Sequence, residues 1–179
     1  AHDVFLSWEN PTSTDFDSVI VRRGTAGYPT SPTDGYSILS ASTATSVTDE
    51  SLEDGVYYYS IFAFDTSGNI SSAATVLGTV DSVLPVITAV ESSARTVSST
   101  ISWVTDEVST SRVVYSVNNS YASSTSEADL GGAAVLSHTV RVDDLLPCVT
   151  YGYKVVSRDL AGNAATSTGY EFTTLGCVG

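Results

Sequence analysis

The sequence predicts an all-β protein made of two antiparallel Greek-key β-sandwiches in tandem. The first observation is a repeat: the stretch Tyr57–Asn69 recurs about 94 residues later as Tyr151–Asn163, and both copies end in Asp-x-x-Gly-Asn. Trp8 and Trp103 recur at nearly the same interval. The second observation is periodicity, because short segments with apolar residues at every second position are separated by turn residues, and no helical period occurs.

The repeat places a first domain at residues 1–80 and a second domain at residues 81–179. The junction between them, Val80–Pro85, is too short and too apolar for a flexible tether. Pro85 also restricts the backbone of the residue before it. We therefore expect a fixed angle between the two domains.

Six segments of the first domain alternate as half-buried strands do, and a long turn, Gly24–Gly35, separates the second segment from the third. These predicted strands are Val4–Trp8, Ser18–Arg23, Tyr36–Leu39, Thr45–Asp49, Tyr57–Phe64 and Ser71–Leu77. The second domain has seven such segments, with hairpin turns at Asn118-Asn119 and Gly131-Gly132. Its predicted strands are Val86–Val90, Val97–Val104, Ser111–Val117, Tyr121–Ser126, Val135–Val142, Thr150–Asp159 and Gly169–Thr174.

A tryptophan near the end of one strand, followed by Leu-x-Pro-x-x-x-Tyr-x-Tyr-x-Val and then Asp-x-x-Gly-Asn, resembles the fibronectin type III family. In the second domain these residues are Trp103, Leu145, Pro147, Tyr151, Tyr153, Val155 and Asp159–Asn163. In the first domain they are Trp8, Leu52, Tyr57, Tyr59, Ile61 and Asp65–Asn69, with Asp54-Gly55 in place of the proline. The resemblance, to the type found in bacterial and archaeal cell-surface or secreted proteins, implies an immunoglobulin-like sandwich. Such sandwiches serve mostly as spacers, adhesion modules or accessory domains.

Four aromatic residues are expected to form the structural core of the two domains. Trp8 and Trp103 each offer about 150–250 Å² of surface for burial between the sheets. Tyr57 and Tyr151 enter the sixth strand of each sandwich at a corner. There the hydroxyl can return to nearby backbone, as in a tyrosine corner.

Cys148 and Cys177 are the only cysteines. Cys148 precedes the sixth strand of the second domain and Cys177 follows the seventh, so both should lie at the same pole of the sandwich. We expect a disulfide between them, worth about 3–4 kcal/mol in the chain-entropy model. Two free thiols in a reducing cell are the alternative.

Composition and charge exclude several classes of function. A net charge of −13 repels phosphate backbones, so nucleic acid and anionic membranes are poor partners. No apolar run approaches the ~18 residues of a membrane-spanning helix. His2 and His138, the only histidines, are expected on the surfaces of different domains, so no catalytic constellation can be assembled from them. We therefore expect no enzyme activity, no cofactor and no metal site.

Pairs of acidic residues lie in the predicted turns of both domains. They are Asp49-Glu50, Glu53-Asp54, Asp106-Glu107 and Asp143-Asp144. None has the alternating ligand spacing of a dedicated calcium loop, so solvated carboxylates are favoured over calcium ligands. Asn69 and Asn118 begin glycosylation sequons in predicted turns and are candidate glycosylation sites.

One face of the first domain is unusually aromatic. If Tyr57, Tyr59 and Ile61 point inward, the alternate residues of the strand point outward. This outward set, joined by one residue of the neighbouring strand, is Ile20, Tyr58, Phe62 and Phe64. It is a candidate partner surface; the alternative is that the turn Gly24–Gly35, with Tyr28, folds over it.

The first domain is also expected to lack its first strand. Only seven residues precede Trp8, whereas Val86–Val90 supplies a strand ahead of the one that bears Trp103. The candidate open edge is Val4, Phe5, Leu6, Ser7 and Trp8. We expect another chain to cover it by strand addition or packing. The alternative is a fragment whose preceding strand has been cut away.

These observations predict a secreted protein with a structural or adhesive role. Serine and threonine make up roughly three residues in ten, no methionine occurs, and Ala1 fits a terminus left by signal-peptide removal or, alternatively, by methionine trimming in the cytosol. We expect part of a cell-surface protein or a subunit of an extracellular filament, with other chains, including copies of itself, as candidate partners.

The alternative is a non-catalytic accessory module, a spacer or a carbohydrate-binding unit, of a secreted glycan-degrading enzyme, with glycans as partners. A third interpretation rests on Leu84–Ile87 and Trp103–Glu107, which resemble the sandwich that precedes metallophosphatase catalytic domains.

Overall fold

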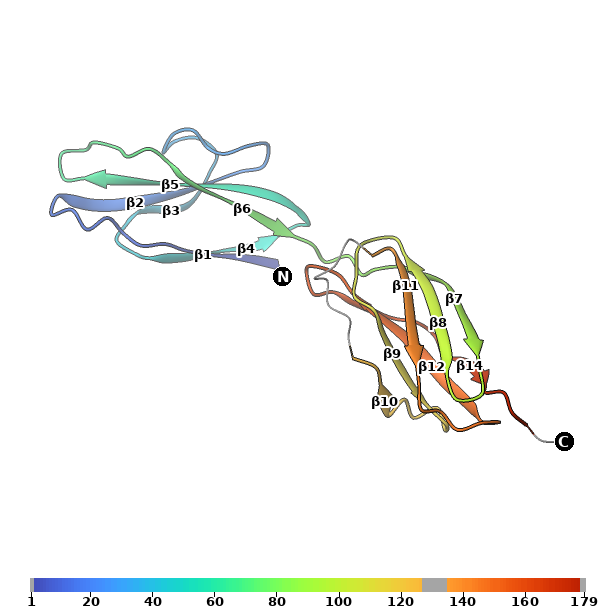
Figure 1. Cartoon of the computed structure of the whole chain (residues 1–179). Helices are drawn as coiled ribbons and strands as arrows, with labels where there is room; N and C mark the ends of the chain where they lie inside the picture. The colour runs from blue at the N-terminus through green and yellow to red at the C-terminus, as the bar shows by residue number, and fades with distance from the viewer. Residues whose placement is uncertain (1, 127–134, 178–179) are drawn as a thin grey trace. The chain divides into compact units, whose positions relative to one another are not determined.

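The computed structural model describes residues 2–126 and 135–177, and their regular structure consists of β-strands (Figure 1). This confirms the predicted all-β class. The chain divides into two units, Ala1–Ser82 and Val83–Gly179. Among the described residues there is no helix that could cross a membrane.

Unit 1 consists of two antiparallel sheets that face each other. Its strands are β1 (His2–Ser7), β2 (Phe16–Gly24), β3 (Tyr36–Ser42), β4 (Ser46–Leu52), β5 (Gly55–Asp65) and β6 (Ala74–Val80). One sheet has the order β3-β2-β5-β6, and the other contains β1 and β4 (Figure 1). Within the described residues, β1 therefore has a strand on one side only.

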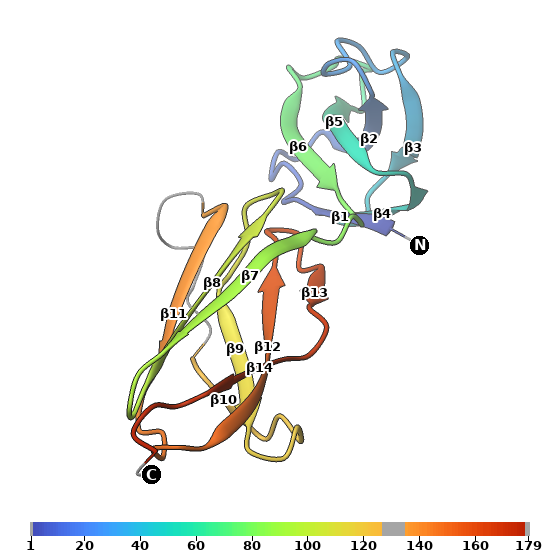
Figure 2. The same ribbon diagram turned by 90° about the vertical axis from the view of Figure 1, so that its right-hand side faces the viewer.

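Unit 2 has the same plan with a fuller second sheet. Its strands are β7 (Ile87–Ala94), β8 (Ser99–Thr105), β9 (Arg112–Ser116), β10 (Ser123–Ser124), β11 (Ser137–Val142), β12 (Thr150–Arg158), β13 (Ala164–Thr166) and β14 (Tyr170–Thr173). The sheet β11-β8-β7 (Figure 2) faces the sheet β10-β9-β12, to which β13 and β14 both add along β12. The strand β8 thus has a neighbour on each side.

Two predicted strands differ from the structure for a shared reason. In unit 2 a short strand, β13, precedes the predicted strand Gly169–Thr174. Regular pairing is interrupted between β13 and β14 at Ser167, whose Oγ accepts the Val155 N–H at 3.0 Å in place of a backbone carbonyl. In unit 1 the Ser71 Oγ accepts the Ala63 N–H at 3.0 Å, and β6 begins only at Ala74. A serine side chain that bonds to the backbone competes with the ladder and ends regular pairing.

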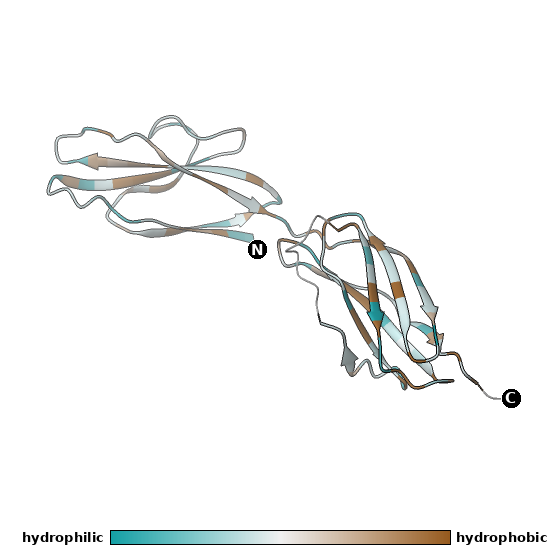
Figure 3. Ribbon diagram, in the orientation of Figure 1, coloured by the Kyte–Doolittle hydropathy of each residue, from teal (hydrophilic) through white to brown (hydrophobic). Residues whose placement is uncertain are grey.

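The cores form where apolar residues alternate along the strands. In Figure 3 strands of both units show apolar bands separated by more polar residues. Trp103 is 1% exposed at the centre of unit 2, whereas Trp8 is only partly buried in unit 1. The core of unit 2 contains Ile101, Trp103, Val113, Val142, Leu145, Tyr151, Tyr153, Val155 and Phe172. The core of unit 1 is smaller, with Leu6, Val21, Leu52, Tyr57, Tyr59 and Val80.

Both corner tyrosines are buried and return the hydroxyl to backbone four or five residues upstream. The Tyr57 hydroxyl donates to the Glu53 carbonyl at 2.8 Å. The Tyr151 hydroxyl instead accepts the Leu146 N–H at 3.0 Å. In each case the bond joins the loop before the strand to the tyrosine near the start of that strand.

The repeated Asp-x-x-Gly-Asn segments fold into matching turns. Asp65 Oδ1 accepts the Asn69 N–H at 2.8 Å while Oδ2 accepts the Asn69 side-chain amide at 2.6 Å. Asp159 binds Asn163 in the same way, at 2.8 and 2.7 Å. These bonds, led by that from the Asn69 side chain, lower the pKa of Asp65.

Cys148 and Cys177 form a disulfide, with their Cα atoms 4.8 Å apart. The Cys148 N–H also donates to the Leu175 carbonyl at 3.1 Å, so backbone and disulfide together attach the end of the chain to the loop before β12. Both cysteines are exposed.

The tyrosine corner of unit 2 can be tested by substitution. Tyr151→Phe removes the acceptor of the Leu146 N–H and should lower the free energy of unfolding by about 1–3 kcal/mol. Chemical denaturation followed by circular dichroism measures the change, with Tyr170→Phe on the outer part of β14 as a control that loses no such bond. A loss below a few tenths of a kcal/mol for Tyr151→Phe would remove the corner from this account.

Candidate functional site

The first candidate site is the free edge of β1. The pairing of β1 with β4 runs from His2 opposite Leu52 to Ser7 opposite Ser46, and the next residue, Trp8, donates its N–H to Thr45 at 2.9 Å. Because donors alternate along an antiparallel strand, the N–H groups of Phe5 and Ser7 point away from β4. They form, with their carbonyls, an edge that no described strand covers.

An apolar groove of about 360 Å³ lies beside this edge. Its lining comes from β1, the residue after it, β5 and β6, and consists of Phe5, Leu6, Ser7, Trp8, Ile61, Ala74, Thr75 and Val76. Towards the start of β1 the gap is closed, because Val4 lies against Gly78, where an added Cβ would meet the Val4 side chain at 3.2 Å. The groove is thus confined to the part of β1 nearest Trp8.

The predicted open-edge residues therefore differ in position. Val4 and Leu6 face the core, Trp8 is partly buried, and Phe5 on the opposite face is 68% exposed. The Trp8 indole N–H donates to the Asn10 side chain at 3.0 Å.

The predicted aromatic partner surface is corrected by the structure. Phe62 is 3% exposed, and Ile20, Tyr58 and Phe64 are each half-buried. The set is therefore not an open patch, and the alternative considered from the sequence, a covering turn, holds.

The turn Gly24–Gly35 lies against one member of this set, Tyr58. Its Tyr28 ring meets the Tyr58 ring edge-on, with centroids 5.1 Å apart. Its Pro32 carbonyl accepts a hydrogen bond from the Arg22 guanidinium. Pro29, in the same turn, is buried. Period-2 alternation assigns faces to a strand but does not reveal a loop that packs over one of them.

Asp49 also departs from its prediction as a solvated turn residue. It lies in β4, is 6% exposed, and accepts two bonds at 2.8 Å from one Arg23 nitrogen. The Tyr59 hydroxyl donates to the same carboxylate at 2.8 Å. Burial, followed by the bond to Asp49, raises the pKa of Tyr59. Arg23, Asp49 and Tyr59 thus form a buried ion pair with an added hydroxyl, which has a packing role. Both oxygens of the Asp49 carboxylate are bonded within the protein and are not available to calcium.

The other acidic pairs and the sequons lie in turns or loops. Asp106 accepts the Val86 N–H at 2.7 Å, Asp143 pairs with Arg141 at 2.7 Å on the surface, and Asp54 accepts the Ser82 hydroxyl at 2.8 Å. Asn69 donates its side-chain amide to the turn carboxylate, whereas Asn118 is exposed.

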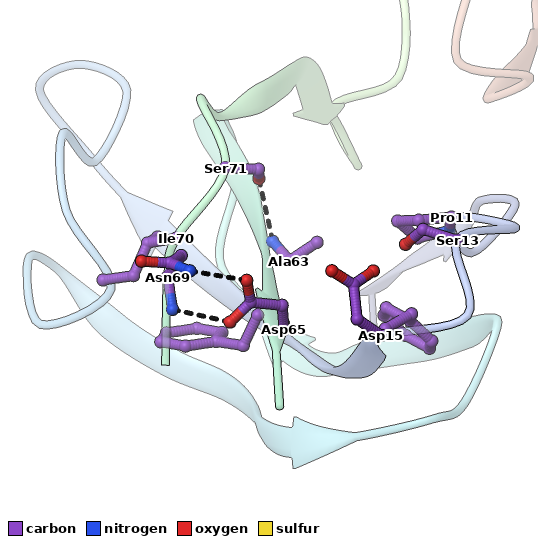
Figure 4. Close-up of a pocket in the computed structure, with 10 residues that line it drawn as sticks. Pro11, Ser13, Asp15, Ala63, Asp65, Asn69, Ile70 and Ser71 are labelled. Carbon is purple, nitrogen blue, oxygen red and sulfur yellow. Dashed lines mark hydrogen bonds between the residues drawn. The ribbon is translucent and has the colours of Figure 1, made fainter. Parts of the chain in front are cut away.

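A second pocket, of about 350 Å³, opens at the far end of β5 (Figure 4). Pro11, Phe16, Phe64 and Ile70 provide apolar lining, and Ser13, Asp15, Asp65 and Asn69 provide polar lining. Asp65 and Asn69 bond to each other, as the dashed lines of Figure 4 show. The Asp15 carboxylate accepts no hydrogen bond from the described residues, so it could meet a polar ligand here.

His138 corrects another expectation, because it is 1% exposed rather than on the surface. Its ring stacks on the Trp103 ring, with centroids 4.9 Å apart and planes within 9°. Nε2 lies 2.8 Å from the Thr105 hydroxyl and Nδ1 lies 2.7 Å from the Ser111 hydroxyl. Burial lowers the pKa of His138.

The bonding pattern assigns one neutral tautomer. The Thr105 hydroxyl donates to the Glu107 carbonyl at 2.7 Å, so it has to accept from His138 Nε2–H. Nδ1 is then the acceptor of the Ser111 hydroxyl. This is the serine–histidine contact used in nucleophilic catalysis, but both residues are buried and no carboxylate of the described residues orients the ring, so the arrangement supports packing. The signal available in the sequence was the spacing His138, Val140, Val142, which places the ring on the inward face of β11.

Because Phe62 is buried, we expect its ring to contribute to the stability of unit 1 and not to a partner surface. Phe62→Ala should lower the free energy of unfolding by about 3–5 kcal/mol, as for other buried phenylalanines. Phe5→Ala, on an exposed ring, is the matched control and should change it by less than about 0.5 kcal/mol. Equal effects in thermal or urea unfolding would contradict the burial of the Phe62 ring within the unit.

The buried histidine predicts a pH dependence of stability. The unfolded chain binds a proton at His138 near its ordinary pKa of 6.5, and the folded chain binds it only at lower pH. Stability should therefore fall as pH drops below about 6.5, with a slope of up to about 1.4 kcal/mol per pH unit until the folded pKa is reached. Urea unfolding between pH 7.5 and 5 measures it; His138→Gln should flatten the slope and His2→Gln should not. An unchanged slope in His138→Gln would contradict the prediction.

No protein-family model and no curated protein matches the sequence. Among solved structures, the chain is similar to domains A168–A170 from titin, with a TM-score of 0.60 and 14% identity, covering 97% of this chain and 59% of that one. It is also similar to the chicken CNTN1 FN1–FN3 domains, with a TM-score of 0.54 and 16% identity, covering 97% of this chain and 63% of that one. The chain thus spans about three fifths of the length of these structures. At such identities the likeness concerns the fold, and the chain has the fold of fibronectin type III domains in tandem.

Proposed function

We propose that the chain is a structural or adhesive protein of the cell exterior, either part of a cell-surface protein or a subunit of an extracellular filament. The observation that carries the proposal is the edge of β1 that no described strand covers, beside an apolar groove. Open edges promote uncontrolled pairing, and burial by a partner is one way in which proteins control them. An array of fibronectin type III-like sandwiches with such an edge is suited to joining chains.

The disulfide supports the exterior location. Cys148 and Cys177 are both exposed, so thiol reductants of a cytosol would reach the bond. Persistence of an accessible structural disulfide requires an oxidising compartment. The net charge of −13 makes chains repel one another in solution, which favours solubility and restricts association to particular sites.

A second candidate function is that of an accessory module in a secreted glycan-degrading enzyme. The pocket that contains Asp15 favours it, because apolar walls with a carboxylate suit a sugar ring and its hydroxyls. Against it, Asp65 and Asn69 in the same pocket are already bonded to each other. Fewer polar groups are thus available to orient a glycan.

Surface labelling and native sizing in the source organism test the proposal. A membrane-impermeant amine reagent should label Lys154, the one lysine of the sequence, on intact cells, with the disulfide oxidised. Protein released without denaturation should sediment in assemblies larger than one chain. Recovery in the cytosolic fraction with free thiols would contradict the exterior location. A released monomer that binds polysaccharide, and loses this binding in Asp15→Ala, would establish the accessory-module function instead.

A further inference from the structure

Tyr36 is an exposed aromatic residue at the start of β3. Its ring is 61% exposed, and the residue lies opposite Arg23 in the β2–β3 ladder. The Arg23 guanidinium lies over the Tyr36 ring, with Cζ 5.0 Å from the ring centroid, and over the Tyr57 ring at 5.4 Å. The guanidinium thus supports one face of the Tyr36 ring, and the other face is left to solvent.

A hollow of about 340 Å³ opens beside this ring. Its lining includes Tyr36 and Arg23, Thr25 directly after β2, and Glu50 and Glu53 at the end of β4. Both glutamate side chains are exposed and accept no hydrogen bond from the described residues. In contrast to the bonded pair in the pocket at the end of β5, these carboxylates are available to a ligand.

Arg23 offers a hydrogen-bond donor at the same place. Its Nη1 makes both bonds to Asp49, at 2.8 Å. Nη2 makes no hydrogen bond within the described residues, and Nε is the one guanidinium nitrogen that is buried without a partner there, so Nη2 reaches solvent. The two hollows that Arg23 lines both also include Tyr36 and Thr25, so this donor lies beside the tyrosine ring.

Unused donors and acceptors side by side select the class of ligand. An ammonium group could bind the glutamates but could not accept from Arg23, which repels it. A carboxylate could accept from Arg23 but would be repelled by the two glutamates. A hydroxyl both donates and accepts, and a sugar ring adds an apolar C–H face that can pack on an aromatic ring. A neutral oligosaccharide therefore uses all the groups of the hollow at once.

We propose that the hollow beside Tyr36 is a binding site for a neutral oligosaccharide. One sugar ring stacks on the open face of Tyr36, while its hydroxyls accept from Arg23 Nη2 and donate to Glu50 and Glu53. Because the guanidinium supports the tyrosine ring before the ligand arrives, little side-chain freedom is lost on binding. The inference adds a ligand to the adhesive part of the proposed function, and it rests on that function for the place where a glycan is met.

Calorimetry with the whole chain tests the site. The probes are the neutral hexasaccharides cellohexaose, mannohexaose and xylohexaose, with hexamers of galacturonic acid and of glucosamine as acidic and basic comparisons. We expect a neutral probe to bind with a Kd below about 1 mM, and neither charged hexamer to bind more tightly. Tyr36→Ala, which removes the ring, should bind at least about tenfold more weakly, and Tyr36→Phe, which keeps it, within about twofold of the unaltered chain.

Two control variants should bind as the unaltered chain does. Phe5→Ala removes another exposed ring of unit 1 that does not line the hollow. Asp15→Ala alters the pocket at the end of β5 instead. If melting curves show that Tyr36→Ala unfolds, the double variant Glu50→Ala/Glu53→Ala provides the second test. It changes two exposed side chains outside the core and should weaken binding at least about threefold.

Three outcomes would overturn the inference. No neutral probe binds, binding persists in both Tyr36→Ala and the double glutamate variant, or binding is lost in Asp15→Ala. Tighter binding of a charged hexamer that depends on Tyr36 would overturn the class of ligand. Failure to bind by a protein that the amine reagent labels on intact cells refutes the hollow alone, and binding by a protein recovered from the cytosol refutes only the proposed function.

Discussion

Backbone N–H and C=O groups along the edge of a β-sheet are left to solvent unless another segment pairs with them, and the two units of the chain differ at one such edge. In unit 2 the strand β8 lies between β7 and β11, and the core beneath it, with Trp103, is closed. In unit 1 the strand β1 has β4 alone among the described residues, and Trp8 is left half-buried beside a groove. One strand accounts for the contrast between two otherwise similar sandwiches.

Both cores also contain polar groups that find partners inside the protein. In unit 1, Arg23, Asp49 and Tyr59 form an ion pair with a donated hydroxyl. In unit 2, the Trp103 indole donates to the Ser157 hydroxyl at 2.9 Å. Buried polar groups that are satisfied fix the register of strands, since a slip by one residue would turn them towards solvent or leave them unpaired. Each unit is thus specified by polar contacts as well as by apolar packing.

The sequence was informative wherever a feature depends on local pattern. Period-2 alternation located the strands, and the Tyr151 corner and the Cys148 disulfide follow from positions along a strand and its neighbouring loops. The sequence was uninformative where distant segments meet: the cover of the Tyr58 ring comes from Tyr28, in a turn elsewhere in the chain. His138 was wrongly predicted to lie on the surface, because the prediction relied on the polarity of the imidazole and not on the inward position of the residue in β11.

Amide hydrogen exchange of the purified chain shows whether the edge of β1 is free to accept a strand. The N–H groups of Phe5 and Ser7 point to the free edge, whereas the matching groups of Thr100 and Ser102 in β8 face β7. With a free edge, the N–H groups of Phe5 and Ser7 should exchange rapidly and those of Thr100 and Ser102 slowly. Slow exchange of comparable degree at both pairs in the isolated chain would contradict it.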